Sequence, residues 1–141
     1  MNGEFYPYDS LYEELAKERS GSYAFQSSSD SELLIALYQR DGINCLSSLH
    51  GEFAFVLYDS TRQLVFAARD RYGVKPLFWT IAGKRLLIAS EAKAFLAFGW
   101  EPEWDVRSIA EDGWLHDERT LFRGVRKVRL TVHYAWLLLI G

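Results

Sequence analysis

The sequence predicts an α+β domain in which helices pack against antiparallel sheets. Apolar residues recur at helical spacing within the first 40 residues, and helical patterns return after residue 90. Between these regions, a nearly continuous apolar run over 53–58 is followed by a turn and a second strand-like run, which is typical of a β-hairpin. The 141 residues, 49% of them hydrophobic, suit one domain with a real core.

The first helix is expected over 11–19. Asp9 or Ser10 can cap its start, and Gly21 follows as a stop signal. The next segment, 23–26, reads as a short strand because it is rich in aromatic residues. A polar serine run then leads into the second helix.

The second helix is expected to begin at or near Asp30 and to end at Gly42. An apolar stripe at helical spacing is formed by Leu33, Leu34, Leu37 and Tyr38. This pattern indicates one face packed on a core and Asp30 in the first turn.

Two hairpins are expected in the middle of the chain, joined by a charged loop over 69–76. Their strands are expected over 53–58, 64–68, 77–81 and 85–89, followed by helices over 90–98 and 106–111 and a last strand over 125–139. Gly73 and Pro76 indicate that the loop is a structural turn, held by an Arg–carboxylate pair. A position beside a partner domain is the alternative for this loop.

The charge balance argues against a nucleic-acid partner. Net charge is −3, so no basic excess is present to neutralise phosphates. The single cysteine, Cys45, permits no internal disulfide, and no Cys/His cluster has zinc spacing. No signal peptide is expected, because 2–9 is polar and aromatic without an apolar core. No membrane partner is expected, because the longest apolar stretch, 135–140, is too short for a bilayer. A reducing, cytoplasmic setting fits this composition best.

Four residues could together bind an amino acid that carries a reactive side-chain carbonyl. Asn2 offers an amide donor and Gly3 lets a backbone N–H approach a ligand closely, so the two could stabilise an oxyanion. Glu4 and Asp30 are carboxylates that could clamp an ammonium group. Taken alone, these residues fit a surface turn and a plain helix cap better.

Five segments, in order along the chain, resemble the motifs of one enzyme family. They are NGEFY at 2–6, SDSE at 29–32, LHGEFAF at 49–55, ARDRYGVKPL at 68–77 and SEAKAF at 90–95. On these motifs the chain resembles the glutaminase domain of the asparagine synthetases, which are class II (N-terminal-nucleophile) glutamine amidotransferases. The resemblance runs from residue 2 to about residue 128.

This resemblance implies a fold and a reaction. The fold would be the N-terminal-nucleophile hydrolase sandwich, with layers αββα and antiparallel sheets, incomplete at its N-terminus. The reaction would hydrolyse L-glutamine and supply ammonia for asparagine formation. Asn2 and Gly3 would form the oxyanion hole, and Glu4 and Asp30 would hold the α-amino group of glutamine.

The resemblance also implies that no metal or cofactor binds to this chain. ATP and Mg²⁺ would belong to a synthetase domain or subunit, whose phosphate-binding loop has no counterpart in the 141 residues. We expect 1–128 to be a partial glutamine amidotransferase type 2 domain and 129–141 to be a divergent tail, both ends being truncated relative to the family.

The family's nucleophile is a cysteine at the mature N-terminus, whereas this chain starts with Met1. Cys45 is not expected to replace it, because nothing nearby in sequence would activate its thiol and a small buried hydrophobe fits the position better. His50, His116 and His133 form no recognisable triad with it. We therefore expect the isolated chain to be inactive.

Two other interpretations remain open. The chain could be a non-catalytic module that keeps the fold and binds glutamine or docks to a partner. It could also be a remnant that folds poorly alone. The aromatic segment 100–104 is expected to be either a docking surface or a lid over the core, with neither preferred.

Overall fold

The computed structural model describes residues 1–6, 8–17, 23–111, 117–129 and 134–137. Its first sheet contains, in spatial order, β1 (Asn2–Phe5), β2 (Gly51–Asp59), β3 (Leu64–Arg69) and β7 (Tyr134–Leu137). Its second sheet contains β5 (Arg85–Ala89), β4 (Phe78–Ala82) and β6 (Arg126–Lys127). The helical elements are α1 (Tyr8–Lys17), α2 (Asp30–Asp41), α3 (Val106–Glu111) and the 3-10 helices η1 (Gly42–Ser47) and η2 (Ala92–Phe98).

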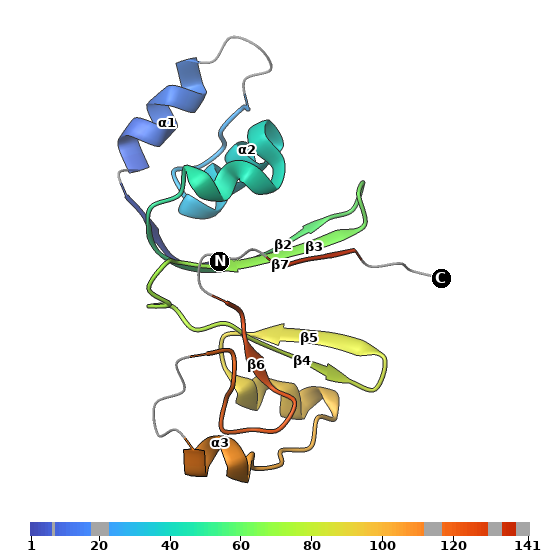
Figure 1. Cartoon of the computed structure of the whole chain (residues 1–141). Helices are drawn as coiled ribbons and strands as arrows, with labels where there is room; N and C mark the ends of the chain where they lie inside the picture. The colour runs from blue at the N-terminus through green and yellow to red at the C-terminus, as the bar shows by residue number, and fades with distance from the viewer. Residues whose placement is uncertain (7, 18–22, 112–116, 130–133, 138–141) are drawn as a thin grey trace.

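The elements form four layers (Figure 1). Helices α1 and α2 cover one face of the first sheet, the second sheet lies beneath its other face, and η2 and α3 lie beyond the second sheet. The strand pairs in both sheets are antiparallel. The predicted α+β class and the αββα sandwich implied by the family resemblance are thus confirmed.

The main core lies between α2 and the first sheet. Phe53 and Phe55 of β2 are buried on this side, and Phe55 meets Phe66 of β3 edge to face with ring centroids 5.3 Å apart. Leu33 and Leu37, four residues apart on α2, are completely buried in the same cluster. The predicted apolar stripe is therefore the face that α2 buries.

A smaller core lies between the two sheets. Ala54 of β2 and Ala67 of β3 face it, together with Leu77 and Val128. Because Phe53 and Ala54 are neighbours on one strand, the pleat sends their side chains to opposite faces of the first sheet. Large rings thus pack under the helices and small alanines against the second sheet.

Helix α2 begins and ends at the residues that the sequence predicts. Ser29 has an extended conformation, with φ −89° and ψ 142°, and its hydroxyl accepts the N–H of Glu32 at 3.3 Å. Gly42 closes the other end at a positive φ of 61°. Asp30 is consequently the first residue of the helix.

The strand predicted over 23–26 is wrong. These residues form no strand, and the N–H groups of Gln26 and Ser27 donate to the carboxylate of Glu32, each at 2.7 Å. The helix predicted over 90–98 is confirmed as the 3-10 helix η2, with Glu91 as its N-cap and Gly99 ending it at φ 79°.

The prediction of a single strand over 125–139 is also wrong, because this region contains two strands in different sheets. β6 joins the second sheet and β7 joins the first, and residues 130–133 between them lie outside the described residues. At the other end of the chain, β1 is a strand that the sequence patterns do not indicate. Helix α1 starts at Tyr8, earlier than expected, and the part of the prediction beyond Lys17 lies outside the described residues.

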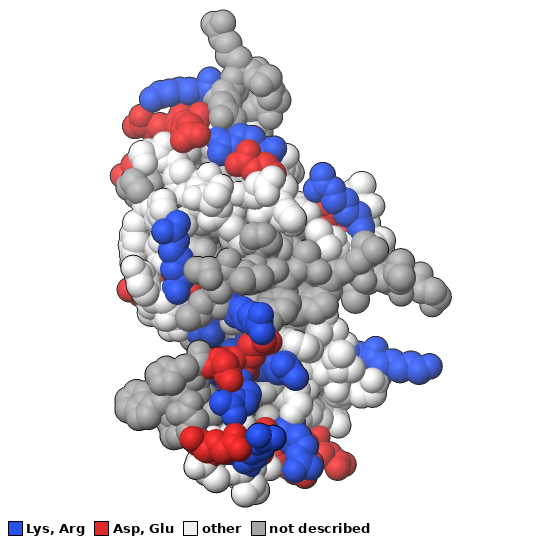
Figure 2. Space-filling view, in the orientation of Figure 1, with Lys and Arg blue, Asp and Glu red and all other residues white. Residues whose placement is uncertain are grey.

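Charged side chains of both signs intermingle on the face shown in Figure 2. Ion pairs join side chains of opposite charge, for example Arg123 with Glu103 at 2.6 Å and Arg119 with Asp117 at 2.7 Å. Within the part of the chain that the structure describes, no helix has the length and apolarity needed to cross a bilayer.

Candidate functional site

Strand β1 carries three of the four candidate residues and lies at an edge of the first sheet. Its register with β2 places Asn2 opposite Ala54 and Glu4 opposite Glu52. Paired residues share a face, so the side chains of Asn2 and Glu4 lie on the side of the second sheet, where both are exposed. Phe5 points the other way, into the main core.

Gly3 allows β1 to lie close to β2. Its φ is 123°, and a Cβ atom added there would overlap the carbonyl oxygen of Glu52. Across the pair, Gly51 has φ 142°, and a Cβ atom there would overlap the carbonyl oxygen of Glu4. The sheet therefore needs glycine at position 3, whatever role the N–H of Gly3 has toward a ligand.

Asp30 lies beside β1. Its Oδ1 accepts a hydrogen bond from the backbone N–H of Phe5 at 2.9 Å. This bond joins residues that are 25 positions apart in the sequence and brings the start of α2 to the strand that carries Asn2, Gly3 and Glu4. One carboxylate oxygen holds the strand, and the half-buried Asp30 retains a second oxygen with further lone pairs.

The phenol of Tyr6 is influenced by three carboxylates of this region. The pKa of its phenol is raised, first by partial loss of hydration and then by the negative charges of Glu52, Glu4 and Asp30. The side chain is 49% exposed, and its backbone N–H donates to the carbonyl oxygen of His50 at 2.7 Å. The negative charges of three carboxylates, from three elements, thus act on this phenol in the same direction.

Glu52 is a site residue that the sequence patterns do not single out. Its carboxylate lies 3.8 Å from the ammonium nitrogen of Lys75. In the sequence, Glu52 is marked only by its place within the LHGEFAF segment. Its position opposite Glu4 becomes visible only once the β1–β2 register is known. Pairing across strands, not proximity in sequence, brings these two acids together.

Glu32 belongs to the SDSE segment but has a structural role. Its side chain is 9% exposed, and its carboxylate accepts the hydroxyl of Ser27 at 2.5 Å as well as two backbone N–H groups. The pKa of Glu32 is lowered, mainly by the Ser27 hydroxyl and the Gln26 N–H. Glu32 therefore fixes the chain that precedes α2.

Two charged side chains hold the loop 69–76. Asp70 is buried and accepts the N–H groups of Tyr72, Val74 and Lys75 at 2.9–3.1 Å. Arg69 donates to the carbonyl oxygens of Gly73 at 2.6 Å and Lys75 at 2.8 Å, and its pKa is lowered by burial. The predicted structural turn is confirmed, with Gly73 at φ 66°. The predicted Arg–carboxylate pair is wrong, because both side chains bond to the backbone.

Cys45 is completely buried at the end of the main core, as predicted. Burial, and then the nearby charge of Asp41, raises the pKa of its thiol to about 12. At neutral pH the thiol is therefore protonated and out of reach of a substrate. His50 is exposed, whereas His116 and His133 lie outside the described residues.

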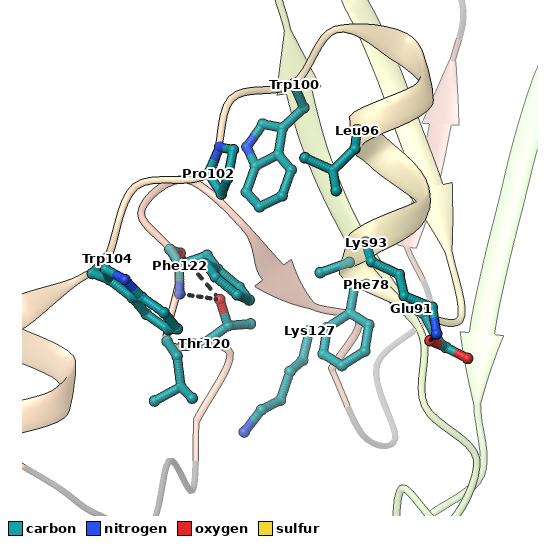
Figure 3. Close-up of a pocket in the computed structure, with 12 residues that line it drawn as sticks. Phe78, Glu91, Lys93, Leu96, Trp100, Pro102, Trp104, Thr120, Phe122 and Lys127 are labelled. Carbon is teal, nitrogen blue, oxygen red and sulfur yellow. Dashed lines mark hydrogen bonds and ion pairs between the residues drawn. The ribbon is translucent and has the colours of Figure 1, made fainter.

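The aromatic segment 100–104 borders a groove of about 630 Å³ on the second sheet's side (Figure 3). Trp104 stacks on Phe122 with ring centroids 4.9 Å apart and stays 59% exposed. Trp100 packs edge to face on both Phe95 and Phe122. Both tryptophans line the groove. The ring contacts of Trp100 fit the expected lid over the core, and the docking surface stays a prediction. The described residues include no group of three or more His, Cys, Asp or Glu side chains placed to hold a metal ion.

Comparison with known proteins places this geometry in a family. The model of the glutamine amidotransferase domain matches residues 1–137. An amidase of Gibberella zeae, chry2, is 50% identical over 92% of this chain and 19% of its own length. An amidase of Penicillium rubens, chyE, is 48% identical over 95% of this chain and 19% of its own length.

Asparagine synthetase 3 of Bacillus subtilis, a glutamine-hydrolysing enzyme, is 38% identical over 91% of this chain and 21% of its own length. The chain thus spans about a fifth of the curated relatives that it matches. Among solved structures, glutamine phosphoribosylpyrophosphate amidotransferase of B. subtilis, complexed with ADP and GMP, aligns with a TM-score of 0.61 and 31% identity. That alignment covers 70% of this chain and 22% of the enzyme. The fold, the motifs and the match over 1–137 together show that this chain belongs to the glutamine amidotransferase domain family and is related to the asparagine synthetases.

Proposed function

We propose that this chain binds L-glutamine as part of an asparagine synthetase-like amidotransferase. The observation that carries the proposal is the hydrogen bond from the Phe5 N–H to Asp30, which joins the Asn2-Gly3-Glu4 strand to the start of α2. Glu4 and Asp30 are assigned to the α-ammonium group of glutamine, which a pair of carboxylates would hold with charge-assisted hydrogen bonds. Asn2 and Gly3 are assigned to the oxyanion that forms on the side-chain amide carbon.

In this reaction class a thiolate attacks the amide carbon of glutamine, the C–N bond breaks, and a thioester forms while ammonia leaves. Water then hydrolyses the thioester to glutamate. Cys45 cannot supply the thiolate, because its thiol is buried with a pKa of about 12. The 141-residue polypeptide alone is therefore proposed to bind glutamine without turning it over.

The ammonia is proposed to form an amide on an acceptor carboxylate, with aspartate, the precursor of asparagine, as the first candidate acceptor. ATP and Mg²⁺ would serve a synthetase domain or subunit that activates this acceptor. An acceptor other than aspartate is a second candidate, supported by the greater identity to the two fungal amidases, 50% and 48%, than to the B. subtilis synthetase, 38%. A cytoplasmic setting is proposed because Cys45 is a free thiol.

A non-catalytic glutamine-binding or docking module is the alternative function. The buried state of Cys45 favours it, since a fold without an accessible thiol can still bind glutamine. Measurement of glutamate release from the isolated chain tests what both functions expect of it, namely that it does not turn glutamine over. A turnover that Cys45→Ser abolishes would show that Cys45 is the nucleophile and would overturn both accounts.

Binding is tested by titrating ¹⁵N-labelled protein with glutamine and following the amide resonances of Gly3 and Phe5 by NMR. Asp30→Asn keeps an oxygen that can accept the Phe5 N–H but removes the charge, so it should weaken glutamine binding about tenfold or more. Asp117→Asn, an equivalent change near the second sheet, should leave the affinity unchanged. If glutamine does not shift these resonances in the unsubstituted protein, the proposed function is wrong.

A further inference from the structure

We propose that Glu52 and Lys75 set the strength of the ammonium site: Glu52 adds a carboxylate to it, and Lys75 opposes the ligand's ammonium group there. This inference rests on the proposed function, because it extends the assignment of Glu4 and Asp30 to glutamine. It adds two residues, from β2 and from the loop 69–76, which lie within motif segments but to which the family resemblance assigns no role here.

The first step is the position of Glu52 relative to Glu4. The two residues are direct partners in the β1–β2 register, so their side chains leave the same face of the sheet from backbones about 5 Å apart. Two like charges in this arrangement repel each other. A pairing that is unfavourable for the sheet alone becomes favourable when a cation lies between the carboxylates.

The second step is the cation that the protein itself supplies. The ammonium nitrogen of Lys75 lies 3.8 Å from a carboxylate oxygen of Glu52, with the two side chains 32% and 47% exposed. A primary ammonium group is thus already held at this cluster. Because it is chemically similar to the α-ammonium of an amino acid, the two compete for the same negative potential.

The third step is the rigidity with which Lys75 is held. Its N–H donates to Asp70 at 3.1 Å, and its carbonyl oxygen accepts from Arg69 at 2.8 Å. Both sides of the Lys75 backbone are therefore fixed by buried or half-buried side chains. These two hydrogen bonds give the loop 69–76 its proposed role, because they hold the backbone of Lys75 where its ammonium group lies near Glu52.

The fourth step is that Glu52 acts on a neighbouring group in the same direction as the two assigned acids. Partial loss of hydration, and then the negative charges of Glu52, Glu4 and Asp30, raise the pKa of the Tyr6 phenol. This agrees with the β1–β2 register, which places Glu52 directly opposite Glu4.

These positions give two predictions of opposite sign. Glu52→Gln removes one negative charge and should weaken glutamine binding about three- to fivefold, as expected for a partly exposed charge. Lys75→Met removes the opposing ammonium while keeping the apolar stem, and should strengthen binding by a similar factor. Both changes should leave the response to glutaramate, the analogue that lacks the α-amino group, the same as in the unsubstituted protein.

The affinities are measured by the same NMR titration at low ionic strength, because salt screens partly exposed charges. Glu91→Gln and Lys93→Met form a matched control, since this exposed pair is joined at 2.5 Å beside the second sheet. Neither control should change the affinity.

Equal affinities in Glu52→Gln, Lys75→Met and the unsubstituted protein, with Asp30→Asn weakened, would overturn this inference and leave the proposed function intact. Weaker binding in both Glu52→Gln and Lys75→Met would also overturn it. That result would mean that the ion pair has only a structural role, since removing either partner would then lower the affinity for glutamine. Absence of glutamine binding in the unsubstituted protein removes the proposed function and this inference together.

Discussion

The carboxylate of Asp30 accepts the backbone N–H of Phe5 at 2.9 Å, so the first residue of α2 is tied to the edge strand β1. Phe5 is buried, and its N–H lies where hydration is limited. The same side chain that is assigned to the ligand therefore also supports the fold, and the two contributions can be separated by choice of substitution.

Asp30→Ala should lower the free energy of unfolding by about 1–3 kcal/mol, because the Phe5 N–H loses a charged acceptor. Asp30→Asn should lose less than half of that, since an amide oxygen can take the same place. Urea unfolding followed by circular dichroism compares the two variants. Equal losses would show that the charge, not the hydrogen bond, supports the strand.

Gly3→Ala should be among the most damaging single changes in the chain. Gly3 has a φ of 123°, and the added Cβ atom would overlap the carbonyl oxygen of Glu52, so β1 would have to move. The free energy of unfolding should fall by about 3 kcal/mol or more. Gly83→Ala is the control, because its φ is 63° but the space around it is open, and it should lose only about 1 kcal/mol. Thermal unfolding of both variants checks the difference, and similar losses would contradict the crowding at β1.

Asp70 should make stability sensitive to acid. Burial alone raises the pKa of this carboxyl, but the N–H groups of Lys75, Val74 and Tyr72 together lower it. The stability that Asp70 contributes is therefore complete above the pKa of an unfolded aspartate, about 3.9, and is lost as the pH falls through the lower folded value.

Unfolding by urea should show this loss below about pH 4. In Asp70→Asn the slope in this range should be smaller, and stability at pH 7 should be about 2–4 kcal/mol lower because buried N–H groups lose a charged acceptor. An unchanged slope would mean that other carboxylates carry the acid response.

Cys45 should resist alkylation in the folded protein. Its thiol is buried with a pKa of about 12, above the usual value, so iodoacetamide at pH 8 should modify it only in unfolded molecules. The raised pKa also means that Cys45 makes stability fall as the pH rises above that of an unfolded thiol, about 8.5. Mass spectrometry with and without urea measures the modification, and rapid labelling without urea would contradict the burial.

Much of the framework is predictable because it follows from local patterns. The stripe on α2 with its Ser29 and Gly42 caps, and the β2–β3 and β4–β5 hairpins, each follow from residues close together in the sequence. β1 and the division of 125–139 do not, since a short glycine-containing strand and the switch between two sheets depend on partners far away.

The candidate site divides in the same way. Asn2, Gly3, Glu4 and Asp30 stand out through motifs, and the bond between Phe5 and Asp30 joins the start of α2 to the strand that carries the other three. Glu52 and Lys75 stay hidden because their positions depend on strand register and on the fold of a loop. Glu32 shows the converse: a residue within a motif whose hydrogen bonds serve the backbone.

Arg69 links parts of the molecule beyond its own loop. It ends β3 of the first sheet, and its guanidinium also donates to the carbonyl oxygen of Val128, next to β6 of the second sheet, at 3.4 Å. Val128 in turn donates its N–H to Leu77 at 2.9 Å. The two sheets are thus joined by a half-buried hydrogen bond as well as by apolar contacts, so heat should unfold both sheets in one transition. Arg69→Met should split that transition into two.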